Sequence, residues 1–166
     1  KYYTFHGGAR FKKTPFKINY DRVGKITQEI IDVCASHNIT LAYENVHWCY
    51  YNYIGFFNEL IKHAPTLKAT LDVKQARQSN LGYKEFIDEM GDKIVTVHLS
   101  DVDENGKMCL PLKGTFNFDE MFSRLLDVGF DGAVLIEAYR SDYGDRKELL
   151  TCVDDIKAVA SKYFKL

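Results

Sequence analysis

The chain has 166 residues, of which 46% are hydrophobic and 27% are charged. That length suits one ordinary domain, and that composition excludes a disordered chain because it supplies enough apolar side chains for a core. The formal net charge of −1 gives no electrostatic reason to expect a nucleic-acid partner, and no run approaches the roughly 18 apolar residues of a membrane span.

Short apolar runs alternate along the chain with segments whose apolar residues recur at helical spacing. Pro65 and Gly91 end two of the expected helices, and Asn117 with Glu120 has the spacing of a capping box. The expected elements in chain order are strand Tyr2–Phe5, helix 19–37, strand 39–43, helix 54–64, strand 67–71, helix 83–90, strand 94–97, a polar loop containing Asn105-Gly106, a helix from Asn117 to about 128, strand Ala133–Ile136 and helix 149–163.

This alternation, at roughly 30 residues per unit, predicts an α/β fold with a parallel sheet. The strand runs are nearly all apolar, which is typical of strands covered on both faces. No linker and no low-complexity stretch divides the sequence, so residues 1–166 are expected to form a single domain.

Each of the five expected strands ends at a polar residue: His6, Glu44, Asp72, His98 and Glu137. A helix cap or a surface acid would explain one such residue, but the same explanation would have to hold in every unit. In parallel α/β folds the carboxyl ends of the strands converge on the ligand site. The side chains are therefore expected to point toward one another.

Three carboxylates and an imidazole gathered in one place would repel one another unless a cation lay among them. Glu44, Asp72, His98 and Glu137 are therefore the predicted ligands of one divalent metal ion. Oxygen-rich coordination with a single nitrogen suits Mn, Mg, Co or Zn, and the sequence does not choose among these metals.

The residues around these ligands resemble the sugar isomerase and epimerase branch of the xylose isomerase-like TIM-barrel superfamily. The segments that carry the resemblance, in the family's order, are residues 42–46 (Ala-Tyr-Glu-Asn-Val), 70–72 (Thr-Leu-Asp), 97–101 (Val-His-Leu-Ser-Asp), 110–114 (Leu-Pro-Leu-Lys-Gly) with Phe118-Asp119, and 135–137 (Leu-Ile-Glu). In that family a Glu, an Asp, a His and a Glu after the last four of eight strands bind one metal. The resemblance implies that this chain is the C-terminal portion of such a barrel, with strands four to eight present and the first three absent.

The sequence departs from the family at one position. Many members carry a His three residues after the metal-binding Asp, whereas Gln75 stands there in this chain. Gln75 can hydrogen-bond a substrate hydroxyl, but it does not titrate near neutral pH and does not replace a ligand to a second metal.

Further residues are candidates for substrate binding. His6 corresponds to the family's His after the fourth strand, and Trp48 begins an aromatic cluster that could be a sugar platform or ordinary packing. Lys74 and Arg140 lie close in sequence to the expected ligands and could hold a phosphate or carboxylate, although solvated loop charges are the alternative. Asp101, three residues after His98, is a further candidate for substrate binding.

The leading hypothesis is a divalent-metal-dependent isomerase or epimerase acting on a small sugar, sugar phosphate or related polyol ketone through an enediolate. Resemblance to ketose epimerases assigns the catalytic roles to Glu44 and Glu137. Three rivals remain open. The same enolate chemistry could expel water in a dehydratase, the fold is shared with endonucleases that act at abasic DNA sites, and a ligand-binding barrel could keep the constellation without turnover.

The sequence also bears on the cellular compartment and the oligomeric state of the protein. The four cysteines are widely spaced and there is no signal segment at the start, which favours reduced thiols in a cytoplasmic enzyme of carbohydrate metabolism. The chain begins at Lys1 and enters an apolar run at once, as though sequence preceded it. Five units form only an arc with open sheet edges, so we expect a homo-oligomer, or further N-terminal βα units that cover the edges.

Overall fold

The computed structural model describes residues 1–10 and 17–165. Its centre is a five-stranded parallel sheet in the order β1-β2-β3-β4-β7, so each strand lies beside its predecessor in the sequence of βα units. The strands of this sheet are β1 (Tyr2–Phe5), β2 (Thr40–Glu44), β3 (Lys68–Asp72), β4 (Ile94–Leu99) and β7 (Ala133–Ile136). This is the predicted α/β architecture of a partial TIM barrel.

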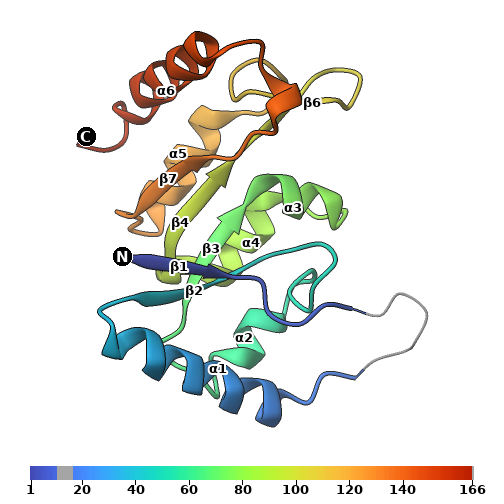
Figure 1. Ribbon diagram of the computed structural model, residues 1–166, viewed down its shortest axis with the longest axis vertical. Coiled ribbons are helices and arrows are strands. Elements are labelled where there is room, and N and C mark those ends of the chain that lie inside the picture. The colour runs from blue at the N-terminus through green and yellow to red at the C-terminus, as the bar shows by residue number, and fades with distance from the viewer. Residues whose placement is uncertain (11–16, 166) are drawn as a thin grey trace.

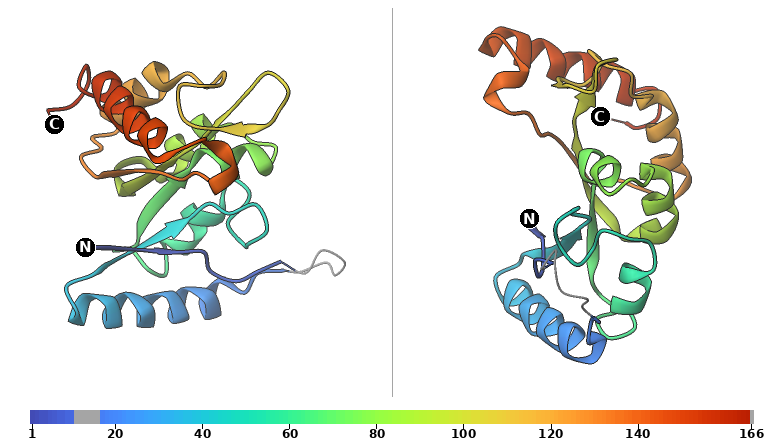
Figure 2. Two further views of the ribbon diagram at one scale, coloured as in Figure 1. Left: turned by 45° about the horizontal axis from the view of Figure 1, so that its top comes forward. Right: turned by 90° about the vertical axis from the view of Figure 1, so that its right-hand side faces the viewer.

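The helices follow the strands and cover one side of the sheet (Figure 1). They are α1 (Tyr20–Ser36), α2 (Phe56–Leu60), α3 (Val73–Gln78), α4 (Tyr83–Met90), α5 (Phe118–Asp127) and α6 (Arg146–Ala160), with 3-10 turns η1 (Gly91–Lys93) and η2 (Arg140–Asp142). Figure 2 shows the result from the side as an arc, with α2, α4 and α5 along its outer side. None of the helices in the described ranges is long and apolar enough to cross a membrane.

Local sequence explains most of the helix ends. The Asn19 side chain caps α1 by accepting from the Arg22 N–H, and Asn117 caps α5 in the same way through Glu120. Gly91 ends α4 with a φ of +52°, a conformation that costs other residues more than glycine. The predicted boundaries of β1, α4 and β7 match the structure, and those of α1 and α5 lie within one residue of it.

Three local predictions were wrong. The second helix, expected over 54–64, spans only Phe56–Leu60: Gly55, at a φ of +104°, precedes it, and residues 61–63 form turns. Helix α3 was missed; Asp72 ends β3 and caps α3 without an intervening loop. The expected polar loop contains a small hairpin, in which β5 (Asp101–Val102) pairs antiparallel with β6 (Met108–Cys109). The Asn105-Gly106 turn was the signal for it, since such dipeptides favour hairpin turns.

Alternation along the strands separates the core from the site. In β2, Leu41 and Tyr43 pack into the hydrophobic core under the helices, whereas Glu44 points to the other face. In β4, Val97 and Leu99 are core residues and His98 lies between them. The apolar face thus anchors each strand, and the polar end residues share the inner face.

The two edges of the sheet remain exposed. Tyr2 and Tyr3 of β1 are 48% and 53% exposed, and Val134 and Leu135 of β7 are 40% and 50% exposed. In contrast, the central strands β2 and β3 are almost fully buried. The five units therefore form a half-barrel, as expected, whose edge strands carry apolar side chains.

Candidate metal centre

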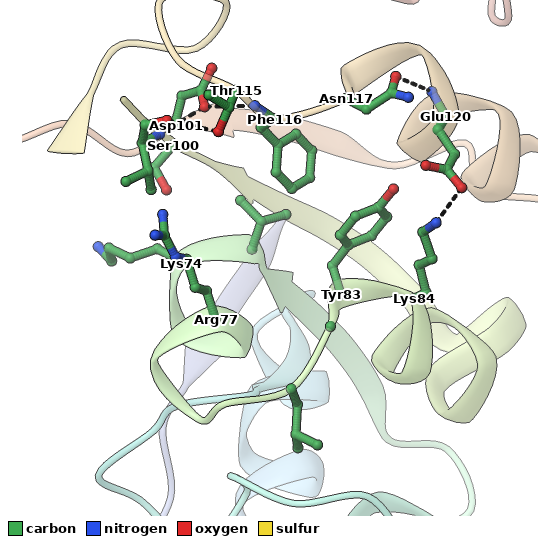
Figure 3. A pocket seen from close by; sticks show the side chains of 14 residues that line it. Lys74, Arg77, Tyr83, Lys84, Ser100, Asp101, Thr115, Phe116, Asn117 and Glu120 are labelled. Carbon is green, nitrogen blue, oxygen red and sulfur yellow. Dashed lines mark hydrogen bonds and ion pairs between the residues drawn. The ribbon is translucent and has the colours of Figure 1, made fainter. Parts of the chain in front are cut away.

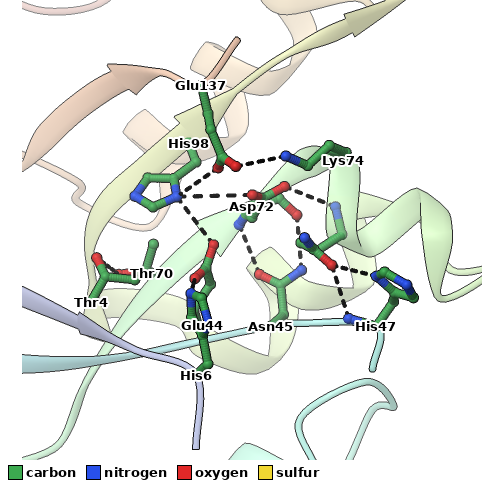
Figure 4. Close-up of polar contacts among 11 residues, drawn as sticks. Thr4, His6, Glu44, Asn45, His47, Thr70, Asp72, Lys74, His98 and Glu137 are labelled. Atoms are coloured by element: carbon green, nitrogen blue, oxygen red, sulfur yellow. Dashed lines mark hydrogen bonds and ion pairs between the residues drawn. The ribbon is translucent and has the colours of Figure 1, made fainter. Parts of the chain in front are cut away.

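Four strands deliver the four predicted ligands to one place (Figure 4). Glu44 and Asp72 are the last residues of β2 and β3, His98 is the penultimate residue of β4, and Glu137 directly follows β7. One ligand atom from each of these side chains lies within 4.8 Å of the other three. Parallel pairing sets this convergence, because Asp72 lies opposite His98 in the β3–β4 register.

His98 lies at the middle of the cluster. Its Nδ1 is 3.1 Å from Glu44 Oε1, 3.2 Å from Glu137 Oε2 and 3.9 Å from Asp72 Oδ2. Glu44 and Asp72 are only 2% and 1% exposed, and His98 is 9% exposed. Glu44, Asp72 and His98 are thus held together largely out of water, whereas the Glu137 side chain is 38% exposed.

The position of Asp72 is fixed by its neighbours. Asn45 is fully buried and bonds the Asp72 backbone twice: its Oδ1 accepts from the Asp72 N–H at 2.8 Å and its Nδ2 donates to the Asp72 carbonyl at 2.9 Å. Asp72 Oδ1 accepts the Gln75 N–H at 2.8 Å as the cap of α3. One carboxylate oxygen is therefore used by the helix, which leaves Oδ2 facing the cluster.

Several buried polar atoms of the cluster lack hydrogen bonds. Within the described ranges, Glu44 Oε2, Asp72 Oδ2 and His98 Nδ1 have no hydrogen-bond partner of acceptable geometry, although charged atoms lie near them. Buried polar atoms without partners are costly and uncommon. A divalent cation in the cluster would satisfy Asp72 Oδ2 and His98 Nδ1, whereas Glu44 Oε2 lies against His6 Nε2 and Glu44 Oε1 faces His98. An oxygen-rich set with one nitrogen suits Mn²⁺, Mg²⁺, Co²⁺ or Zn²⁺. The residues present therefore fit a metal ion.

Electrostatics points the same way. Burial, reinforced by the neighbouring Glu137 and Glu44, raises the pKa of Asp72 from 3.8 to about 8. Burial alone would lower the pKa of His98, but Glu137 and Glu44 outweigh it and raise that pKa from 6.5 to about 9. His98 in turn holds the pKa of Glu137 well below its usual range. Without a metal, the cluster keeps protons that a cation would displace.

Lys74 adds a cation beside the cluster. It is only 4% exposed, and its Nζ donates to Glu137 Oε1 at 2.7 Å. The same Nζ lies 5.0 Å from the centre of the Tyr139 ring. Of the predicted substrate-binding residues, Lys74 is the one in direct contact with a metal-ligand candidate on the β7 side.

His6 and Trp48 approach the cluster from the β1 side. His6 Nε2 lies 2.7 Å from Glu44 Oε2, and the His6 ring meets the Trp48 ring edge to face at 5.9 Å. Trp48 is 43% exposed, so its ring remains accessible beside the cluster. The structure thus places His6 against Glu44 and Trp48 against His6.

Gln75 has a different local partner. Its Oε1 lies 2.6 Å from His47 Nδ1 and accepts the His47 backbone N–H at 3.1 Å. These contacts join α3 to the segment after β2, so the Gln75 carbonyl oxygen is used within the protein. Sequence reasoning assigned no role to His47, three residues after Glu44; Asn45 was noted only as part of the 42–46 segment that carries the family resemblance.

Asp101 and Arg140 lie outside the cluster. The Asp101 carboxylate is 1% exposed and accepts four backbone N–H groups, those of Val102, Leu112, Gly114 and Phe116. Arg140 donates to the carbonyls of Tyr143 and Gly144 and lies over the Tyr143 ring. Both side chains thus organise loops, and a role for them in substrate binding stays a prediction.

Comparison with known proteins agrees with this architecture. The family described as xylose isomerase-like TIM barrel matches residues 1–157. The chain belongs to this family. An uncharacterized protein of Methanocaldococcus jannaschii is 30% identical over 144 residues, which make up 82% of this chain and 52% of that protein. The chain thus spans about half the length of the curated relative that it matches.

Solved structures of xylose isomerase-like proteins have the same fold. The IolI protein, determined with a bound zinc atom, superposes with a TM-score of 0.77 at 21% identity, covering 100% of this chain and 65% of that one. A D-tagatose 3-epimerase-like protein gives 0.73 at 18% identity, covering 98% and 64%. A probable 3-DHS dehydratase, AsbF of Bacillus anthracis, gives 0.72 at 15% identity, covering 95% and 62%. At these identities the likeness concerns the fold.

Proposed function

We propose that this protein is a divalent-metal-dependent isomerase or epimerase that acts on a small sugar, sugar phosphate or related polyol ketone. The observation that carries the proposal is the buried group of Glu44, Asp72, His98 and Glu137, whose ligand atoms lie within 4.8 Å of one another and are in part without hydrogen bonds. Membership in the xylose isomerase-like family supports it. The endonuclease alternative gains no support from Gln75, which stands where a further ligand would be needed.

The proposed chemistry is proton transfer at a carbon next to a carbonyl. A bound divalent ion would polarise the carbonyl and its neighbouring hydroxyl, which acidifies the C–H bond between them. Glu44 and Glu137 reach the cluster from different strands, β2 and β7, so one could remove the proton and the other return it. The intermediate would be an enediolate of the sugar.

The remaining residues would position the reactants. Asn45 holds the Asp72 backbone in place, and His6 lies against Glu44 Oε2. Trp48 offers a partly exposed ring beside His6, suited to packing against the apolar face of a sugar.

The proposed base is tested by Glu137→Gln. The substitution removes a carboxylate from the site but little volume, and the Glu137 side chain is 38% exposed. We expect deuterium uptake from D₂O into a panel of ketoses to fall to background, while the cooperative unfolding transition is retained. Glu59→Gln, which removes a carboxylate of α2 that is paired with Lys62, is the control and should exchange normally. Normal exchange by a folded Glu137→Gln protein would remove Glu137 from the mechanism.

A dehydratase acting on a similar substrate is the second candidate. One of the similar folds belongs to a probable dehydratase, and an enediolate can expel a neighbouring hydroxyl instead of taking back its proton. NMR analysis of the products distinguishes the two reactions, because elimination consumes the substrate irreversibly while epimerisation reaches a mixture of isomers.

We also propose that the exposed edges of the sheet are covered in the working protein, by a second copy or by additional βα units. The apolar side chains on β1 and β7 support this, since exposed edge strands with such residues pair readily. Light scattering after size exclusion should show the 166-residue chain by itself as an oligomer or aggregate. A stable monomer of 19.1 kDa with cooperative unfolding would contradict the proposal.

A further inference from the structure

A cavity of about 430 Å³ (Figure 3) is lined in part by Lys74, which also contacts the metal-ligand cluster, although none of the four ligand candidates lines it. Helix α3 forms one wall with Lys74 and Arg77, and Tyr83 and Phe116 form the opposite side, with their rings 4.9 Å apart. Ser100, two residues beyond His98, lines the same space. The volume suits a sugar-sized ligand.

Lys74 connects the cavity to the cluster. Its side chain lines the cavity while its Nζ contacts Glu137 Oε1 at 2.7 Å. An ammonium has three N–H donors, and within the described ranges Glu137 is the one hydrogen-bond acceptor at Lys74. A cation that is only 4% exposed therefore has donors left for a ligand that enters from the cavity.

The other charged side chains around the cavity differ in whether they already have a partner within the protein. Glu120 is paired with Lys84, and the Asp101 carboxylate accepts four backbone N–H groups. Arg77 is exposed, and its side chain has no ionic or hydrogen-bond partner in the described part of the chain. The positive charge that remains for a ligand therefore lies on α3, at Arg77 and, in part, at Lys74.

We propose that this cavity binds an anionic substituent of the substrate, a phosphate or a carboxylate, through Lys74 and Arg77. The two residues are one helical turn apart on α3, so both can reach one anion, and Arg and Lys form strong charge-assisted hydrogen bonds with either group. The inference rests on the proposed function: the carbonyl end of the molecule lies at the cluster, and the acidic end lies past Lys74. The substrate class is then an acidic polyol ketone rather than a neutral sugar.

The test compares three six-carbon ketoses by calorimetric titration of the metal-loaded protein: fructose, fructose 6-phosphate and 5-ketogluconate. We expect at least one anionic compound to bind about tenfold or more tightly than fructose, and the tighter of the two identifies the preferred group. Arg77→Gln should reduce the binding of that anion by about tenfold and leave fructose unaffected. Lys74→Gln should act in the same direction.

Lys62→Gln is the matched control, since Lys62 is also a lysine but is paired with Glu59 and does not line the cavity. It should change anion binding less than about twofold. If neither anion binds more tightly than fructose, or if Arg77→Gln and Lys62→Gln bind anions equally, the subsite is wrong. If the anion binds as expected but no ketose exchanges its proton, the proposed reaction fails while the anion subsite stands.

Discussion

Asp72 and Asp101 are two buried aspartates with opposite surroundings. Each is 1% exposed and each lies near the carboxyl end of a strand. Both oxygens of Asp101 accept backbone N–H groups, four in all, whereas Asp72 accepts one N–H and its Oδ2 has no acceptable hydrogen-bond partner in the described residues. The comparison teaches that burial alone does not mark a functional carboxylate; an unsatisfied oxygen facing other ligand atoms does.

The largest effect should follow from Asp72→Asn. The amide oxygen can still cap α3 at the Gln75 N–H, but the charged ligand is lost. We expect metal affinity to fall on the order of 1,000-fold, more than the loss of a supporting residue would cause. The metal-free protein should be about as stable as the parent near neutral pH, because the raised pKa of Asp72 already keeps that side chain protonated and uncharged, like the amide that replaces it. Competition titration against a chelator measures the first effect and thermal unfolding the second.

Asp101→Asn should give the reverse pattern. An amide presents one oxygen, so two of the four N–H groups would face an NH₂ group. We expect the free energy of unfolding to fall by about 2–3 kcal/mol, with metal affinity of the folded protein nearly unchanged. Asp103→Asn is the control, because this exposed carboxylate only organises the hairpin turn. If denaturant unfolding gives equal losses in the free energy of unfolding for the Asp101 and Asp103 substitutions, the structural role assigned to Asp101 is wrong.

The pH dependence should be the smallest effect and should separate the two sites further. The pKa values of Asp72, about 8, and His98, about 9, lie above their ordinary values of 3.8 and 6.5. Raised pKa values stabilise the fold at low pH, and this stability is lost as pH rises through them. The metal-free protein should therefore lose about 1 kcal/mol per pH unit as pH rises, with Asp72 contributing between its ordinary pKa of 3.8 and about 8 and His98 between 6.5 and about 9.

Metal binding should show the opposite trend. Coordination requires deprotonated Asp72 and His98, so affinity should increase over the same range with release of protons. Calorimetry in buffers of different ionisation enthalpy counts those protons. Binding with no proton release near pH 7, or metal-free stability that is flat from pH 6 to 9, would show that the cluster does not hold its protons as described.

Much of the cluster could be predicted from sequence because the same feature, a polar residue at the end of a strand, recurs in each βα unit. Parallel strands place their ends at one edge of the sheet, so Glu44, Asp72 and Glu137 could be grouped from strand ends alone. The apolar runs fixed the strands themselves, since packing under the helices requires them. His98 fits the same rule, although β4 continues one residue past it.

Other features depend on contacts between distant segments. The role of Asp101 is set by N–H groups up to 15 residues away, and Gly114 allows it because a Cβ there would lie 2.4 Å from Asp101 Oδ1. The two bonds from Asn45 to Asp72 cross from β2 to β3. Helix α3 is too short for a periodic pattern to reveal it. Such features appear only when the chain is folded.

The most direct test of the metal centre is a Co²⁺ titration of the metal-free protein followed by visible absorption. We expect one equivalent of Co²⁺ to bind per chain, with a spectrum typical of oxygen and nitrogen ligands. This spectrum should change in His98→Gln and disappear in Asp72→Asn. The folded Asp101→Asn protein should retain it. Absence of saturable binding, or identical titrations for the parent and Asp72→Asn, would contradict the claim that these four strand-end residues hold a metal ion.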